Sequence, residues 1–465
     1  MKHAKLVVKT IGTFLLLFFS LSNAFAGVID TTQSSLQNFL KKGKMSGHMR
    51  NYFMATNNYG PLTDYYSLAI GAGIGYQTLE FKGFTTGFSG FFLFNVWSND
   101  LGTIDPLGKG RSRYELGNFD MQDPYNRNNL ERLESLFLKY RFGKSSLTIG
   151  RQNLLTPFIN PQDGRMRPSL QDAFWLEVQE LNWLEFRAGY IYGMSPRSSV
   201  NWFTVGRSIG VYPVGKGVDG NPSGYRNSVE SDYVFLGNLQ LKPFSSLKMN
   251  YWFYHVDNVF NLHFIQTDLN YPIYSKKGSI IAGVQYGLQS SSGNGGNSNP
   301  AKTYLLPGHS TGFISSRLGM RWLNNTFSLN YTHIFDQDRF LFPREWGIEP
   351  FYTFMARERN EGAANTHAFT FRSEHQLNSA LKTGAIVGYF LMPDVLNFRQ
   401  NKNGMPSYNQ LNLYLNYSFK GPLNGLNLQA LYVYKGLVGE TYNDLQYVFN
   451  RVMMSNYNLI VNYTL

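Results

Sequence analysis

Residues 136–168 read LFLKYRFGKSSLTIGRQNLLTPFINPQDGRMRP, and the residues in the first part of this stretch alternate between two faces. Leu136, Leu138, Tyr140 and Phe142 share one parity, whereas Phe137, Lys139 and Arg141 share the other. A strand here has one apolar face and one largely cationic face. A tight turn follows, the alternation resumes, and the chain then enters a segment with three prolines. The stretch therefore predicts a hairpin that leads into a stiff, charged loop.

The first 26 of the 465 residues have the pattern of a secretory signal. Three lysines precede a short apolar run, and Ala24-Phe25-Ala26 supplies a small-x-small cleavage site. The alternative is a retained helical anchor, but the apolar run is short and the cleavage pattern follows it at once. We expect residues 1–26 to be a signal peptide and the mature chain to be exported.

The chain is basic, with a formal net charge of +12 and no cysteine. An exported protein without a block of lysine and arginine is not expected to bind nucleic acid. Attraction of anionic solutes or of lipopolysaccharide phosphates fits this charge better. The absence of cysteine excludes a disulfide framework, a thiolate metal site and a cysteine nucleophile.

Aromatic residues make up 16% of the chain and glycine occurs 45 times, yet the mean hydropathy is only −0.28. No stretch after the signal reaches the roughly 18 consecutive apolar residues that a spanning helix needs. Transmembrane β-strands dilute lipid-facing apolar residues with lumen-facing polar ones, which gives this composition. A large secreted β-sandwich or propeller is the alternative.

Alternating segments recur along the chain, and short turns between them alternate with long irregular connections. This asymmetry is typical of outer-membrane barrels, which have tight periplasmic turns and large external loops. We predict an all-β protein: a transmembrane antiparallel β-barrel of about 18 strands (16–18) over residues 44–465, with inward-folded external loops. Residues 27–43 are predicted to form an N-terminal periplasmic arm, and residues 444–454 and 456–465 the last two strands.

Parity within the predicted strands places a set of basic residues toward the lumen. Guanidinium groups suit a pore wall because they stay charged and offer fork-shaped donors to carboxylates or phosphates. The alternative is that these residues pair with Asp163, Glu185 and Glu374 and only hold the wall and the loops together. The predicted basic track consists of Arg50, Lys139, Arg141, Arg187, Arg317, Arg321 and Arg372.

Arg151 is an exception to this pattern, because it shares the parity of Leu147 and Ile149. An arginine that faces lipid at the bilayer midplane costs about 2–4 kcal/mol. We therefore expect Arg151 at the membrane edge, where the strand becomes a loop.

Catalysis finds little support in the sequence. The eight histidines form neither an H-x-x-x-H nor an H-E-x-x-H pair, and no Ser/His pair stands out. We expect no enzyme activity, no metal site and no cofactor.

Three stretches resemble the OprD-type outer-membrane porins, a family of substrate-specific channels that includes the chitoporins. They are residues 50–53 (RNYF), the opening stretch through residues 163–168 (DGRMRP), and residues 343–353 (PREWGIEPFYT). The resemblance implies an eighteen-stranded barrel, a constriction formed by inward loops, and a ladder of basic side chains. Carried onto this chain, the constriction residues are Asp163, Arg165, Arg167, Arg344 and Glu345. Gly164 stands where the family often has serine.

The expected function is passive, selective diffusion of small carboxylate-bearing solutes, such as amino acids or short peptides, across an outer membrane. One alternative is an oligosaccharide channel, including one for chito-oligosaccharides, and another is a structural or adhesive surface barrel. In the oligosaccharide reading the sugar-stacking residues are Trp252, Tyr254, Phe390 and Tyr414. The expected partners are small solutes, outer-membrane lipid and lipopolysaccharide, and the barrel assembly machinery, with a homotrimer as a candidate assembly.

Overall fold

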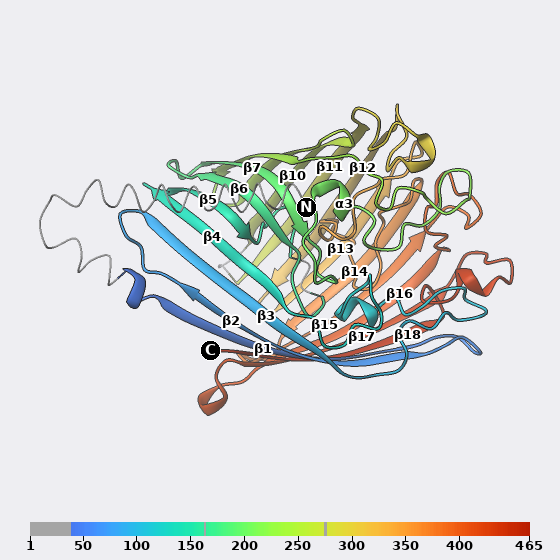
Figure 1. Cartoon of the computed structure of the whole chain (residues 1–465), viewed down its shortest axis with the longest axis horizontal. Coiled ribbons are helices and arrows are strands. Elements are labelled where there is room, and N and C mark those ends of the chain that lie inside the picture. The colour runs from blue at the N-terminus through green and yellow to red at the C-terminus, as the bar shows by residue number, and fades with distance from the viewer. Residues whose placement is uncertain (1–38, 162–163, 274–276) are drawn as a thin grey trace, which may run out of the picture.

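The computed structural model describes residues 39–161, 164–273 and 277–465. The predicted signal peptide, most of the predicted arm, and Asp163 lie outside the described residues. Within them, eighteen strands form one antiparallel sheet that closes on itself (Figure 1). The predicted barrel of about 18 strands is confirmed.

Turns and loops join each strand to the next along the chain, and some of these loops contain a short helical turn. None of the helices that the structure describes is long and apolar enough to cross a membrane. The strands are β1 (Lys44–Asn57), β2 (Tyr65–Gln77), β3 (Phe84–Ser98), β4 (Arg132–Phe142), β5 (Ser145–Gln152), β6 (Leu170–Val178), β7 (Leu184–Ser195), β8 (Val234–Phe244), β9 (Leu247–Val256), β10 (Phe260–Ile273), β11 (Gly278–Ser291), β12 (Ser310–Trp322), β13 (Asn325–Ile334), β14 (Thr366–Gln376), β15 (Leu381–Leu391), β16 (Tyr408–Ser418), β17 (Leu426–Leu437) and β18 (Met454–Thr464). The helical turns are η1 (Leu116–Asn118), α3 (Val205–Ser208), η2 (Pro300–Lys302), η3 (Gly421–Leu423) and η4 (Leu445–Tyr447).

The barrel closes where β1 pairs with both β2 and β18. Tyr52 lies opposite Ala69 on one side and Ile460 on the other. Closure leaves no strand edge with unpaired backbone groups, which is a requirement for a sheet surrounded by hydrocarbon.

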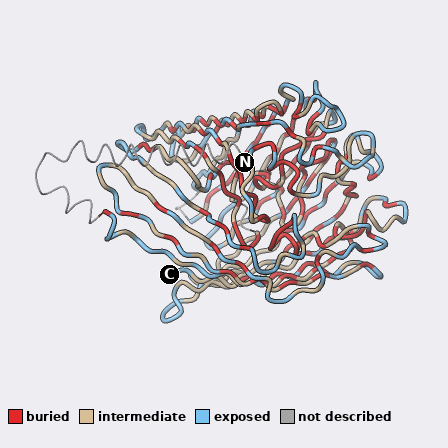
Figure 2. The backbone as a smooth tube through the Cα atoms, in the orientation of Figure 1, coloured by how far each residue is buried: buried red, intermediate tan, exposed pale blue. Residues whose placement is uncertain are grey.

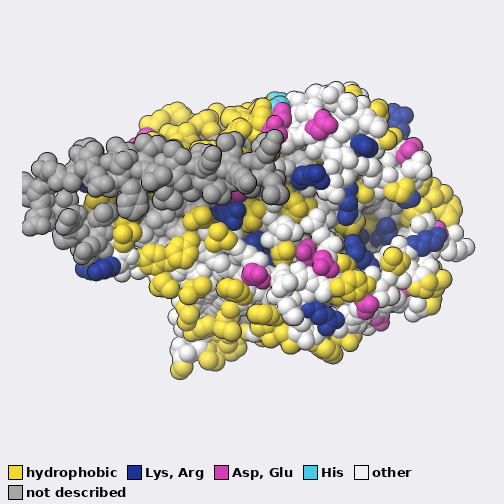
Figure 3. Space-filling view, viewed as in Figure 1, with side chains coloured by type: hydrophobic (Ala, Val, Ile, Leu, Met, Phe, Trp, Pro, Cys, Tyr) yellow, Lys and Arg dark blue, Asp and Glu magenta, His cyan; other side chains and the backbone are white. Residues whose placement is uncertain are grey.

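The two faces of each strand differ as the parity pattern predicts. On β12 and β13 the apolar residues Leu318 and Leu329 lie opposite each other and are 64% and 65% exposed. Arg317, on the other face of β12, contacts a loop inside the barrel. Figure 3 shows hydrophobic side chains over the strands of the visible face, with many charged side chains at the loop-bearing end.

The long connections fold back toward the lumen, so buried backbone gathers inside the loop-bearing half (Figure 2). One predicted strand is wrong, because residues 444–453 belong to such a loop and contain η4. Val448, Phe449 and Val452 are buried there among inward loop residues. Their apolar spacing imitates a strand, although they contact protein and not lipid.

Phe158 is the centre of an apolar cluster inside the barrel. It is 1% exposed, and its ring centroid lies 5.1–6.5 Å from six other rings. Those rings belong to wall strands and to the loop between β13 and β14: Tyr254, Phe264, Phe313, Phe340, Phe342 and Phe351. At Gly347 a Cβ would lie 2.0 Å from the Phe158 carbonyl oxygen, so the two loops are in direct backbone contact. A second cluster, around Tyr408 and Phe390, fills the opposite part of the interior.

We expect Phe158→Ala to lower the free energy of unfolding by about 3–5 kcal/mol, because it leaves a cavity among aromatic rings that cannot collapse easily. Denaturant titration of the barrel in lipid vesicles measures this change. Leu155→Ala is the matched control, since Leu155 lies in the same loop and is 77% exposed. Equal denaturant concentrations at the unfolding midpoint for the two variants would contradict the role given to Phe158.

Candidate functional site

The loop between β13 and β14, residues 335–365, crosses the lumen, and we call it the strap. Its first half packs against the wall through Phe340 and Phe351, which contact Phe313 of β12. Its second half reaches the barrel seam. There the Arg357 guanidinium donates to the Tyr52 hydroxyl at 2.8 Å and to Asn456 Oδ1 at 2.7 Å. It also donates to Asn458 Oδ1. The strap therefore links two distant parts of the wall.

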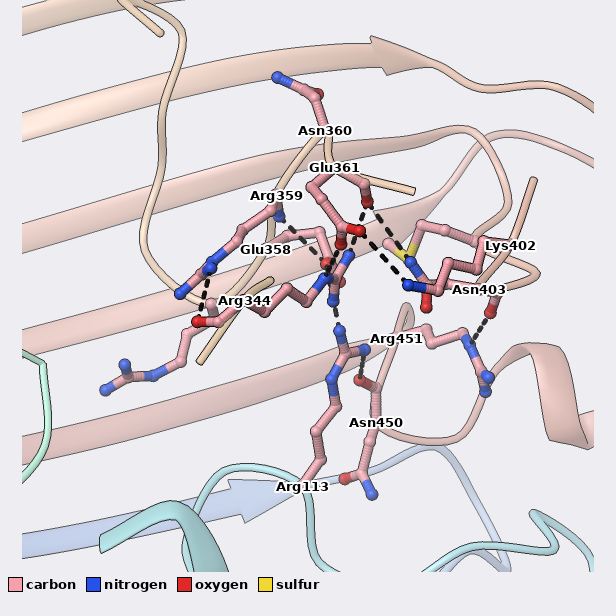
Figure 4. Close-up of polar contacts among 12 residues, drawn as sticks. Arg113, Arg344, Glu358, Arg359, Asn360, Glu361, Lys402, Asn403, Asn450 and Arg451 are labelled. Atoms are coloured by element: carbon pink, nitrogen blue, oxygen red, sulfur yellow. Dashed lines mark hydrogen bonds and ion pairs between the residues drawn. The ribbon is translucent and has the colours of Figure 1, made fainter. Parts of the chain in front are cut away.

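Two carboxylates of the strap hold it in place. Glu358 is 3.1 Å from Arg113, 3.2 Å from Lys435 and 3.7 Å from Arg344. Glu361 is 2.5 Å from Arg344 and 3.4 Å from Lys402. Figure 4 shows Arg113 and Lys402 reaching these strap residues from two other loops. Every one of these groups is buried or largely buried, so each charge needs its partners.

The electrostatics of this network follow from its geometry. Burial raises the pKa of Glu358, but Arg113, Lys435 and Arg344 outweigh burial and hold the pKa well below its usual range. The pKa of Glu361 is lowered in the same way, since Lys402 and Arg344 offset its burial. Both carboxylates are therefore ionised at neutral pH.

The predicted constriction residues of the strap serve this framework. Arg344 joins Glu358 and Glu361, and its pKa is raised because these carboxylates outweigh its burial. Glu345 accepts a hydrogen bond from the backbone N–H of Gly210 at 2.6 Å, and burial raises its pKa. Both side chains hold loops together.

The other constriction loop, between β5 and β6, carries Arg165 and Arg167. Arg167 is 2% exposed and donates to the carbonyl oxygens of Leu130 at 2.7 Å and Ser199 at 3.0 Å. Arg165 is also buried, and burial together with the positive charges of Arg357 and Arg197 lowers its pKa to about 9. Arg165 thus stays protonated at neutral pH within a group of cations.

This group extends beyond the predicted residues. Burial lowers the pKa of Arg359 to about 10, with further contributions from Arg197 and Arg344. Arg50 stacks on the Tyr52 ring at 5.8 Å, and the Tyr52 hydroxyl binds Arg357. We call Arg50, Arg165, Arg197, Arg357 and Arg359 the cationic cluster. Four of them are partly accessible, whereas Arg165 is buried.

Sequence reasoning missed Arg197, Arg357 and Arg359. The charge density of residues 356–361, ARERNE, is a local signal for the two strap arginines. No local signal identifies Arg197, because it is the folding of the β7–β8 loop that brings it near Arg165.

The predicted basic track has three kinds of surroundings. Three of its arginines contact wall acids or the strap: Arg187 pairs with Glu177 and Glu185, Arg317 with Asp268 and the Tyr352 ring, and Arg372 with Glu374 and the Phe354 carbonyl. Arg141, 2.7 Å from Glu80, and Arg321 are exposed beside the short turns. Lys139 is half-buried on the inner face of β4, and Arg50 belongs to the cationic cluster.

The aromatic residues proposed for sugar stacking are largely covered. Trp252, Tyr254 and Phe390 are at most 3% exposed, and loop residues pack on them. The Tyr414 hydroxyl donates to Glu374 at 2.5 Å. Their ring faces are not arranged as a platform for sugars. Within the described residues, no group of three His, Asp or Glu side chains could hold a metal ion.

A closed barrel with loops folded into its lumen is also what the comparisons with known proteins find. The family described as outer membrane porin, OprD family, matches residues 37–365, which is more than half of the chain. The chain belongs to the OprD family of outer membrane porins. It is therefore an integral outer-membrane protein of a family whose members pass small solutes and act as channels rather than enzymes.

Solved structures with the same fold include channels from two bacteria. OccAB4 of Acinetobacter baumannii has a TM-score of 0.70 at 18% identity, over 90% of this chain and 97% of that one. OccAB2 of the same organism has a TM-score of 0.70 at 15% identity, over 92% of this chain and 99% of that one. OccK9 (OpdG) of Pseudomonas aeruginosa has a TM-score of 0.69 at 13% identity, over 92% of this chain and 99% of that one. At these identities the likeness shows the fold alone. The curated proteins include no match.

We expect Glu358→Gln to release the strap, because it leaves Arg113, Lys435 and Arg344 without their shared counter-charge. Breaking a buried ion group in this way costs about 3–5 kcal/mol. Trypsin should then cleave the strap faster, and single-channel currents should fluctuate more. Glu440→Gln is the control, since Glu440 is exposed on another external loop. Wild-type cleavage rates in Glu358→Gln would show that the network does not hold the strap.

The same network predicts the pH dependence of strap closure. A carboxyl whose pKa is lowered by folding stabilises the folded state above its unfolded pKa, and this stabilisation is lost as the pH falls toward the folded pKa. Current fluctuations should therefore not rise between pH 8 and 5, and should rise only below about pH 4.3, the ordinary value for glutamate. Glu349 of the strap, whose pKa burial raises to about 7, becomes protonated within the first range, which relieves a buried charge and does not loosen the strap. A rise in current fluctuations that already begins between pH 7 and 6 would contradict the role given to Glu358 and Glu361.

Proposed function

We propose that this OprD-family porin conducts small carboxylate-bearing solutes, such as amino acids or short peptides, by selective passive diffusion. The observation that carries the proposal is the cationic cluster beside the strap. Its arginines come from β1 and from three different external loops, so the fold gathers charges that the sequence keeps far apart. Positive groups at the narrow part of a channel favour anions and raise their local concentration.

Three acids near the cluster support this proposal because they have partners outside it. Glu358 and Glu361 face two or three cations each. Glu115, buried near Arg165, accepts hydrogen bonds from Thr56 at 2.5 Å and Ser112 at 2.9 Å, and burial raises its pKa. None of these contacts uses a guanidinium group of the cationic cluster.

The predicted site residues are given three proposed roles. We assign the first contact with the solute to the accessible arginines of the cationic cluster, with Asp163 kept as a candidate acid of the same loop as Arg165. Arg141 and Arg321 would draw anions at the mouth beside the short turns. The loop and wall supports in this proposal are Arg167, Arg187, Arg317, Arg344, Glu345 and Arg372.

The alternatives have less support. An oligosaccharide channel needs open aromatic faces, and loops cover three of the four rings proposed for it. An adhesive barrel needs no cationic cluster in its lumen. Contacts with lipopolysaccharide, use of the barrel assembly machinery and a homotrimer stay predictions.

Reversal potentials in a planar bilayer under a salt gradient test the proposal. The wild type should prefer anions, and Arg50→Ala should lower the anion-to-cation permeability ratio by roughly fivefold, the effect of about 1 kcal/mol of lost attraction. Arg399→Ala is the control, because it removes an exposed external arginine. Cation preference in the wild type, or an unchanged ratio in Arg50→Ala, would overturn the proposal.

A further inference from the structure

One sector of the wall differs from the rest in charge. The strands β16, β17 and β18 read YNQLNLYLNYS, LNLQALYVYKGL and MSNYNLIVNYT, and Lys435 is their one charged residue. By contrast, β4 alone carries two arginines, a lysine and a glutamate. The sector lies between the charged wall and the seam with β1.

Amide side chains occupy the inner face of this sector on the side of the short turns. We define the amide wall as Asn416, Asn427, Gln429 and Asn462. They alternate with residues of the lipid-facing parity, such as Leu413 and Leu459, and are themselves half-buried.

Strand pairing makes the amide wall continuous. Asn416 lies opposite Gln429, and Asn427 lies opposite Asn462. Asn462 in turn lies opposite Arg50 of the cationic cluster. Farther along β18, Asn456 and Asn458 bind the Arg357 guanidinium. A solute that leaves the arginines therefore passes directly along amides.

Three of the four amides of this wall have no hydrogen-bond partner among the residues that the structure describes. Asn427 donates to the Ser418 hydroxyl at 3.0 Å, whereas the side chains of Asn416, Gln429 and Asn462 make no hydrogen bond within the described part of the chain. Each amide offers two donor hydrogens and one acceptor oxygen. This pairing capacity matches hydroxyl groups, which also donate and accept, and it adds no net charge.

We propose that the preferred solute is a polyhydroxylated monocarboxylate, that is, a sugar acid. This inference rests on the proposed function: the cationic cluster receives the carboxylate, and the amide wall receives the hydroxyl groups. Several weak, exchangeable hydrogen bonds suit conduction, because a solute must be able to leave each position.

Two other classes of carboxylate fit less well. An aromatic or aliphatic acid needs an open apolar face, but Trp252, Tyr254 and Phe390 are buried under loops. A basic amino acid needs an uncompensated acid, but Asp268, Glu358 and Glu374 all face cations. The amide wall supplies neither feature.

The test compares glucuronate with cyclohexanecarboxylate, an anion with a ring of the same size and no hydroxyl groups. Permeability relative to chloride is obtained from reversal potentials in planar bilayers. Glucuronate should be favoured at least about fivefold, the effect of one net hydrogen bond. Equal permeability, or preference for cyclohexanecarboxylate, would overturn the inference even if the channel remains anion-selective.

A triple variant, Asn416→Leu/Gln429→Leu/Asn462→Leu, should abolish this preference while chloride selectivity persists. Asn51→Leu is the matched control, because Asn51 has the lipid-facing parity of β1, opposite Ile70 and Val461. Loss of the preference in the control, or its retention in the triple variant, would contradict the amide wall. If the triple variant does not insert, the wild-type comparison of the two anions still decides. Loss of anion selectivity in the wild type would instead reject the proposed function.

Discussion

Closure of the sheet through the hydrogen bonds between β1 and β18 is the constraint on which the other features depend. In hydrocarbon each unpaired backbone group costs several kcal/mol, so the first and last strands must meet. Eighteen strands enclose a lumen too wide to select small solutes by its wall alone. Selection must therefore come from chain segments brought into the lumen, and the external loops supply them.

Two different forces hold those loops inside. Aromatic rings around Phe158 bury apolar area against one side of the wall. On the other side, Glu358 and Glu361 gather cations from separate loops, which places charge in a dry environment where it must be paired. The apolar cluster provides stability, whereas the ion network fixes the path of the strap and hence the position of Arg357.

The sequence predicted what depends on alternation and not what depends on loop folding. Parity placed Arg317 and Arg372 inside, and the structure has both contacting the strap. Parity also led us to expect Arg151 at the membrane edge, where its strand becomes a loop. Arg151 pairs with Asp172 and stacks on Trp202 beside the external loops. The same reasoning failed for residues 444–454, because apolar residues buried under loops have the spacing of a strand. It could not find Arg197, whose neighbours are distant in sequence.

Two conspicuous arginines of the loops, Arg167 and Arg344, have their donors directed at carbonyl and carboxylate oxygens of the protein, and both are supports in the proposed function. Arg50 and Arg357 lie at the seam, where the wall strands beside them carry amides and no acids. An anion bound there competes with no protein carboxylate on β1 or β18. In the proposed function the uncharged sector preserves the attraction of the arginines, and its amides let the solute move on without a second charged site to trap it.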